Sequence, residues 1–251
     1  MRSSVGSISS APEASHRLLH IVANGKNFKM QHLEFASKWV AEEFVKKATR
    51  DELQAVISLL ASSSGALKGM LYEPVMHTVL SQGGCFTAVP VMYDNTSTFW
   101  RGVEEKLVLD RCTTQEFFQV LPKIAKPQVY YRPSSPIFPT MDAFMCGTNT
   151  CDIFQMTVQD SKELDASKLN SLLHGLQLPA KVTPRLHFVV PEDRYSDFKL
   201  KAGEIWPPKR RQAALRMKLY IVKGVYARLQ VCARSGHVGC HAAGGGRKLW
   251  L

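Results

Sequence analysis

Three polar residues in the stretch 138–158 have types that could support chemistry on a phosphate. Asp142 interrupts an apolar run, and Gln155 and Thr157 interrupt a second run that is rich in strand formers. Alternate side chains of a strand share a face, so Gln155 and Thr157 point the same way. If the two runs pair as a hairpin, Asp142 converges with them on one point, which suits a metal or a phosphate. The alternative is that all three form the solvent face of a half-buried hairpin.

A second carboxylate, Glu73, lies in the stretch 67–80, whose apolar residues follow helical spacing. Glu73 and His77 are four residues apart, so they share a face of this helix. A surface pair on a helix is the alternative for both residues. His77 could act as a base, but packing beside the carboxylate is the role that we expect. Pro74 fits the helix only in its first turn.

The elements around these residues predict an α/β fold. In chain order they are a helix at 67–80, a strand at 85–92, the two strands of the hairpin with a turn at 147–150, a helix at 167–176 and a strand at 185–190. Three shorter elements are a strand at 106–109, a helical turn at 114–120 and a strand at 129–131, and a last helix is expected at 192–201. With 94–131 set aside as an insertion, the order is αβββαβ. A helix between the third and fourth strands permits a parallel crossover, and hence a mixed sheet.

The rest of the chain divides by composition. A strand at 17–22 and a helix over 33–45 precede a second helix, which the capping box Thr49-Arg50-Asp51-Glu52 opens. The polar run 62–65 is the candidate boundary between domains. We therefore predict a disordered N-terminus at 1–16, a helical segment at 17–64, a main domain at 65–203 and an irregular basic tail at 204–251.

The net charge of +11 belongs almost entirely to the tail. Residues 201–251 contain 11 Lys and Arg and one acid, Glu204, whereas residues 1–200 are nearly neutral. A basic tail attracts nucleic acid or anionic surfaces without specificity. No apolar run reaches the roughly 20 residues that span a bilayer. The first 17 residues lack the apolar core of a signal peptide, so export would need another route or a preceding segment.

Six cysteines are spread along the chain without a CxxC pair. Cys85, Cys146 and Cys151 lie in apolar runs, where we expect buried free thiols. The tail also holds Cys232, His237, Cys240 and His241, whose types suggest zinc. Their spacing matches no common zinc finger, so we favour a coincidence of composition.

The chain resembles a known family in a series of motifs. These are KGMLYEPVMHTVLSQGGCF, VYYRP, FPTMDAFM, DIFQMTVQDSKELD and RLHFVVPED, preceded by RLLHIV and FASKWVAEEF. In this order they resemble the C-terminal region of Crinkler effectors of oomycetes and fungi, and of the related retrotransposon hot spot proteins of trypanosomatids. The resemblance covers roughly residues 15–200. Residues 17–64 resemble the end of the NTPase module of that family.

The resemblance implies a restriction-endonuclease-like core. Its site would consist of Glu73, Asp142, Gln155 and Thr157, with Mg²⁺ or Mn²⁺ held by the oxygens of Glu73, Asp142 and Gln155. The implied reaction is metal-assisted hydrolysis of phosphodiesters. Active enzymes of this class carry Lys on the third strand, where this chain has Thr157. Lys162 could reach back from beyond the strand, but weak or lost activity is the stronger expectation.

The resemblance also implies a setting for the protein. Crinklers are secreted and act in host cells. The resemblance therefore implies nucleic acid as the partner, with host DNA in the host nucleus as the candidate, and no membrane. The ubiquitin-like header of Crinklers is not found in this sequence. Gly25-Lys26 has no preceding Gly at the spacing that a phosphate-binding loop requires, so no ATP site is expected. The alternatives are a non-catalytic binding module on the same fold and a degenerate gene product without activity.

Overall fold

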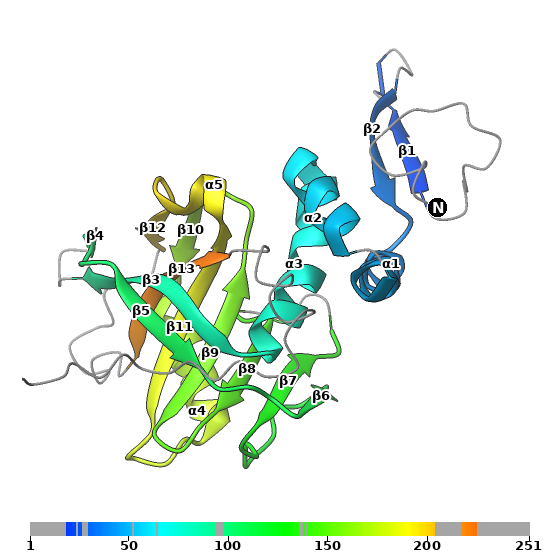
Figure 1. Ribbon diagram of the computed structural model, residues 1–251. Coiled ribbons are helices and arrows are strands. Elements are labelled where there is room, and N and C mark those ends of the chain that lie inside the picture. Colours follow the sequence, from blue (N-terminus) through cyan, green and yellow to red (C-terminus); the bar gives the residue numbers. More distant parts are fainter. Residues whose placement is uncertain are drawn as a thin grey trace, which may run out of the picture.

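A nine-stranded mixed sheet forms the centre of the protein in the computed structural model (Figure 1). Its strand order is β4-β3-β13-β11-β9-β8-β7-β6, and β5 also pairs with β3. The predicted mixed α/β class is therefore confirmed. The residues described are 19–23, 25–26, 30–51, 53–63, 65–93, 98–135, 138, 140–203 and 217–224.

The helices and strands have the following bounds. The helices are α1 (Lys38–Asp51), α2 (Leu53–Ser62), α3 (Gly65–Ser81), α4 (Ala166–Leu176) and α5 (Glu192–Tyr195). The strands are β1 (Leu19–Ala23), β2 (Met30–Phe35), β3 (Gly84–Tyr93), β4 (Phe99–Arg101), β5 (Glu105–Leu109), β6 (Thr114–Phe118), β7 (Val129–Pro133), β8 (Ala143–Cys146), β9 (Thr150–Met156), β10 (Ser161–Leu164), β11 (Thr183–Pro191), β12 (Lys199–Ala202) and β13 (Lys218–Gly224).

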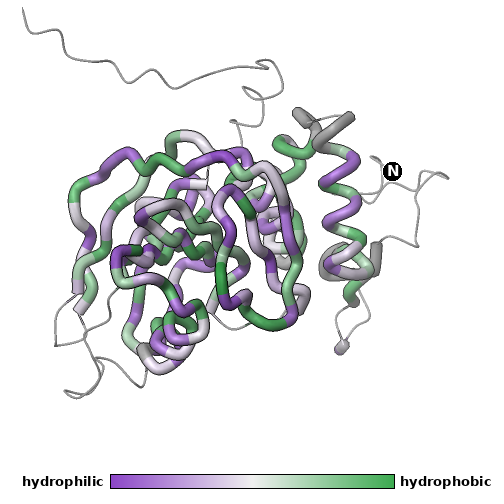
Figure 2. The backbone as a smooth tube through the Cα atoms, turned by 90° about the horizontal axis from the view of Figure 1, so that it is seen from below, coloured by the Kyte–Doolittle hydropathy of each residue, from purple (hydrophilic) through white to green (hydrophobic). Residues whose placement is uncertain are grey.

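The sheet separates two apolar cores. One core joins α1, α2 and α3 to the sheet face that carries Tyr130, Ala143 and Phe154. The other joins α4 to the face that carries Phe144 and Ile153. Figure 2 shows how apolar and polar residues alternate along the backbone of these elements. Because α1 and α2 share a core with α3, the helices on either side of the polar run 62–65 pack as one layer.

Packing, not local propensity, maintains α3. Pro74 lies in the middle of this helix and not in its first turn, where it was expected. A proline there removes one backbone hydrogen bond and costs about 3 kcal/mol in a helix interior. Leu71, Val75 and Met76 are completely buried beside it. Burial of each such side chain contributes about 1.5–3 kcal/mol, which offsets the cost of the proline.

The hairpin and the crossover after it have the predicted connections. β8 and β9 are antiparallel, and β9 and β11 are parallel on either side of α4. Asp165 caps α4 by accepting hydrogen bonds from the backbone N–H of Ser167 (2.8 Å) and of Lys168 (3.2 Å). Such a cap satisfies N–H groups that a helix start leaves without partners.

The strand beside the hairpin differs from the expected one. β3, the predicted first strand of the core, is separated from β8 by β13, β11 and β9. Besides β9, the neighbour of β8 is β7, most of which lies in the segment 94–131 that was set aside as an insertion. Around the hairpin, and with β3–β6 and β10 set aside, the elements follow the order α3, β7, β8, β9, α4 and β11 along the chain.

The tail is not irregular throughout. Residues Lys218–Gly224 form β13, which lies inside the sheet, parallel to β11 and antiparallel to β3. Leu219, Tyr220, Ile221 and Val222 of this strand are buried. A run of four strand-forming apolar residues supplies core contacts to both faces, which explains why this part of the tail belongs to the fold.

Three smaller expectations were also wrong. Residues 114–118 form strand β6 and not a helical turn, because they pair in parallel with β7. The last helix ends at Tyr195, and Lys199–Ala202 pairs with β10. Cys146 and Cys151 lie opposite each other in the hairpin and form a disulfide, while Cys85 and Cys112 are free.

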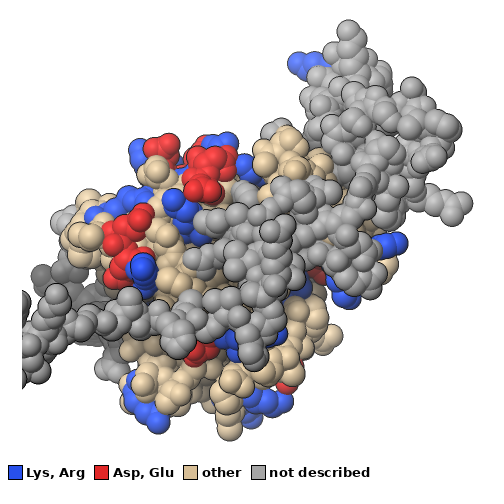
Figure 3. Space-filling model, in the orientation of Figure 1, with Lys and Arg blue, Asp and Glu red and all other residues tan. Residues whose placement is uncertain are grey.

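Acidic and basic side chains are interspersed over the described part of the surface in Figure 3. This agrees with the near-neutral balance of residues 1–200. No helix among the described residues is long and apolar enough to cross a bilayer.

Candidate functional site

A cavity of about 250 Å³ brings together α1, α3, β7 and the residues just before β8. Glu73 and Asp142, two of the four predicted site residues, both line it. They reach it from different elements, α3 and the start of the hairpin. The other lining residues are Lys38, Trp39, Glu42, His77, Phe117, Arg132, Pro133, Ser134, Ser135, Phe138 and Met141.

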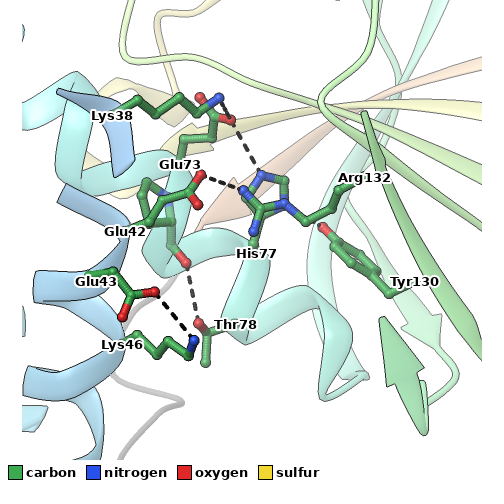
Figure 4. A network of polar contacts seen from close by, with 10 residues as sticks. Lys38, Glu42, Glu43, Lys46, Glu73, His77, Thr78, Tyr130 and Arg132 are labelled. Atoms are coloured by element: carbon green, nitrogen blue, oxygen red, sulfur yellow. Dashed lines mark hydrogen bonds and ion pairs between the residues drawn. The ribbon is translucent and has the colours of Figure 1, made fainter. Parts of the chain in front are cut away.

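Glu73 is held by two neighbours (Figure 4). Its Oε1 lies 2.6 Å from Lys38 Nζ and 3.3 Å from His77 Nε2. On its other side, His77 Nδ1 lies 3.0 Å from the hydroxyl of Tyr130. An ionised carboxylate only accepts hydrogen bonds, so Nε2 carries the proton and Nδ1 accepts from Tyr130. The expected packing of His77 beside the carboxylate is thus what the structure has.

The protonation of this pair follows from burial and from its neighbours. Burial alone raises the pKa of Glu73, but the His77 hydrogen bond and the charge of Lys38 outweigh it and lower that pKa to about 2. Burial lowers the pKa of His77 to about 4, against the raising effect of Glu73. At neutral pH, Glu73 is therefore an anion and His77 is neutral.

Asp142 faces the cavity because the chain bulges before β8. Its N–H donates to the carbonyl of Phe154 (2.8 Å), which also pairs with Ala143. Asp142 and Ala143 thus both lie opposite Phe154, as in a β-bulge. Because of this bulge, Asp142 lies on the α3 side of the sheet together with Ala143. Its Oδ2 accepts a hydrogen bond from Met156 N–H (2.6 Å).

The environment of Asp142 favours its protonated form. Burial raises the pKa of Asp142, and the negative charge of Glu73 raises it further, to about 6. The Met156 N–H and the positive charges of Lys38 and Lys162 act in the opposite direction. Lys162, which the sequence placed beyond the third strand, is therefore within electrostatic range of Asp142.

Gln155 and Thr157 do not line the cavity. Phe154 and Met156 pack on the α3 side, so Gln155 between them faces the α4 side. Thr157 is buried, and its hydroxyl accepts a hydrogen bond from Gln159 N–H (3.1 Å). The predicted set therefore separates into Glu73 with Asp142 on one face, and the remaining two residues away from them.

Arg132 is the second cation of the cavity and was not among the predicted site residues. Its Nη2 donates to Glu42 Oε1 (2.7 Å), which ties β7 to α1. Its guanidinium lies 5.1 Å from the centre of the Phe117 ring. Arg132 shares a face of β7 with the buried Tyr130, two residues earlier, and that alternation was the available signal.

Each of the two carboxylates has one oxygen that could bind a metal. Among the described residues, no hydrogen bond is made by Oε2 of Glu73 or by Oδ1 of Asp142. No group of three or more His, Cys, Asp or Glu side chains in the same residues is placed to hold a metal. Mg²⁺ usually needs only one or two carboxylates, because water and substrate phosphate supply its other ligands. Such an ion would therefore need no protein ligand beyond the two carboxylates.

A second polar cluster lies on the α3 side of the sheet and was also missed. Asp152 accepts hydrogen bonds from Arg185 Nε (2.6 Å) and Nη2 (2.8 Å), and its Oδ1 is 2.6 Å from His187 Nε2. The His187 ring stacks between Phe154 and Tyr220. Polar residues at i and i+2 in an apolar strand, as at 185 and 187, were the signal for it.

The suggested zinc residues Cys232, His237, Cys240 and His241 lie outside the described residues. So do residues 1–16 and Glu52 of the capping box.

Comparison of the chain with protein-family models, with curated proteins and with solved structures finds no match.

Proposed function

We propose that the cavity at Glu73 and Asp142 is a nuclease-like site that hydrolyses phosphodiesters with the help of Mg²⁺ or Mn²⁺. The observation that carries the proposal is that these two carboxylates, from separate elements, line one cavity with Lys38 and Arg132. With β3–β6 and β10 set aside, the order α3, β7, β8, β9, α4, β11 supports a restriction-endonuclease-like core, with β7 as its first strand. In this proposal the protein is a Crinkler-type effector module that acts on host nucleic acid after secretion, in the host nucleus.

Oε2 of Glu73 and Oδ1 of Asp142 would hold the metal. When bound, it would polarise the phosphate and lower the pKa of a water molecule. In the reaction a water oxygen forms a bond to phosphorus and the P–O bond to the leaving group breaks. One water proton goes to solvent, and the leaving oxygen gains a proton.

The other residues of the cavity would orient Glu73 and neutralise the charge of the phosphate. His77 is neutral and fixes Glu73 through Nε2, so its support does not add charge. Arg132 presents a guanidinium to the phosphate oxygens, and guanidinium groups bind phosphate through two parallel N–H donors. Lys162, whose charge acts on Asp142, would take part of the role that the missing third-strand Lys has in active enzymes of this class.

A non-catalytic nucleic-acid-binding module is the second candidate. It is favoured by the ion pair between Lys38 and Glu73, since a carboxylate so paired binds a metal less readily. It is also favoured by Thr157, which carries no charge and lies outside the cavity.

A plasmid-nicking assay on the full chain separates the two candidates. With Mg²⁺ or Mn²⁺ we expect nicking that EDTA stops and that Asp142→Asn lowers by about a hundredfold or more. Asp197→Asn, at an exposed aspartate outside the cavity, is the matched control and should nick like the unchanged chain. No nicking by the unchanged chain, or equal nicking by both variants, rejects the catalytic function.

A further inference from the structure

Two aromatic side chains line the cavity and yet remain exposed. Trp39, on α1, is 68% exposed and Phe117, on β6, is 59% exposed. Large aromatic side chains are usually well buried unless they contact a ligand or a partner. Here both belong to the same cavity, so one ligand could contact both.

Arg132 lies beside these rings and has unused donors. It stacks on Phe117 and gives one hydrogen bond, through Nη2, to Glu42. A guanidinium has five N–H donors, and among the described residues no other hydrogen-bond acceptor for Arg132 is present. Its side chain is mostly buried, with 11% of its surface exposed, and it lines the cavity, so a ligand in the cavity can contact it. We call Trp39, Phe117 and Arg132 the aromatic rim.

The size of the cavity limits what the rim can bind. At about 250 Å³ it is smaller than the roughly 300–1,000 Å³ of sites that enclose a drug-sized ligand. A phosphate and part of its nucleotide fit inside, while the rest of a polymer must lie across the opening. Flat aromatic rings beside a phosphate-binding cation match the pattern by which proteins bind single strands.

We infer that the aromatic rim binds single-stranded nucleic acid, with a base stacked on Trp39 or Phe117 and the neighbouring phosphate on Arg132. A duplex is a poor ligand because its bases already stack on one another and cannot reach the rings unless they are flipped out. The inference rests on the proposed function, since it names the substrate class of the same cavity. Binding itself requires neither metal nor cleavage.

Fluorescence anisotropy of the full chain in EDTA tests this inference. The probes are labelled oligothymidylate, oligouridylate and a DNA duplex of equal length. We expect Trp39→Ala and Phe117→Ala each to weaken binding of a single strand by about fivefold to 150-fold, the usual effect of losing one stacked base. Any duplex binding that we expect from the basic tail requires neither ring and should not change.

Matched variants exclude a general effect of losing an aromatic ring. Trp100→Ala, on β4, removes a tryptophan that is 42% exposed and outside the cavity, and should leave binding unchanged. Trp39→Phe and Phe117→Tyr keep a ring and should keep most of the affinity. Unchanged single-strand affinity in both alanine variants, or an equal loss for the duplex or in Trp100→Ala, overturns the inference. A loss for either DNA or RNA strands supports it, and their ratio shows whether the site reads the 2′-hydroxyl.

The same proteins distinguish failure of this inference from failure of the proposed function. A chain that does not nick plasmid but binds single strands through Trp39 and Phe117 rejects the catalytic function and keeps the rim. If nicking depends on Asp142 but single-strand binding is the same in Trp39→Ala and Phe117→Ala, the proposed function stands and the inference about the aromatic rim is wrong.

Discussion

Glu73 and Asp142 line one cavity, but their protonation differs widely. The pKa of Glu73 is lowered to about 2, whereas that of Asp142 is raised to about 6. The first carboxyl therefore contributes stability that is present above its ordinary pKa of 4.5 and is lost as the pH falls towards 2. The second contributes stability that is present at acid pH and is lost as the pH rises through 6. Pairs whose pKa values are forced apart are common where acid–base chemistry takes place.

Asp142→Asn should therefore change stability in a pH-dependent way. The unfolded chain holds this proton with the ordinary pKa of 3.8, and the folded protein with a pKa of about 6. Between pH 5 and pH 7.5 the unchanged protein should lose about 1.4 kcal/mol of unfolding free energy relative to the variant. Urea denaturation at both pH values measures the difference. A difference that is flat with pH would contradict the raised pKa of Asp142.

His77 and Tyr130 form a buried pair whose coupling can be measured. Tyr130 is completely buried, and its hydroxyl donates to His77 Nδ1. His77→Phe should cost about 1–3 kcal/mol of unfolding free energy, because the hydroxyl is left without a partner. Tyr130→Phe should cost less than this, and the double variant should cost less than the sum by about 1 kcal/mol. Additive effects in urea denaturation would show that the two side chains are not coupled.

β13 should be essential to folding even though it lies in the basic tail. It pairs with β3 on one side and with β11 on the other. A chain that ends at Gly203 leaves two facing strand edges unpaired, so we expect it to aggregate or to unfold without cooperativity. A chain that ends at Val225 retains every described strand and should unfold in one sigmoidal transition. The prediction fails if the shorter chain also unfolds cooperatively in a urea titration followed by circular dichroism.

The sequence predicted what depends on periodicity and turn chemistry. The hairpin, α3, α4 and the parallel crossover all follow from apolar spacing and from residues that favour turns or caps. Alternation also correctly placed Gln155 and Met156 on opposite faces of the sheet. It could not tell which face of the sheet α3 would cover, because that depends on long-range packing. Asp142 reached the α3 side only through a bulge that no local pattern reveals.

Other parts of the site could not be found without knowledge of sheet order. Lys38 and Arg132 meet Glu73 and Glu42 because α1 packs beside α3 and β7, and these contacts join residues far apart in the chain. The apolar run at 219–222 lies between two lysines, and the whole segment 204–251 was predicted to be an irregular tail. A run of four strand formers is weak evidence alone, and only its place between β3 and β11 gives it meaning.

The position of β13 has a consequence for synthesis. It is the last described strand along the chain, yet it occupies an inner place in the sheet. Until β13 has been synthesised, the edges of β3 and β11 that pair with it have no partner strand. The nascent chain therefore presents two unpaired strand edges. Completion of the sheet therefore has to wait until residues 218–224 have left the exit tunnel. Before that point both strand edges are open to pairing with another chain.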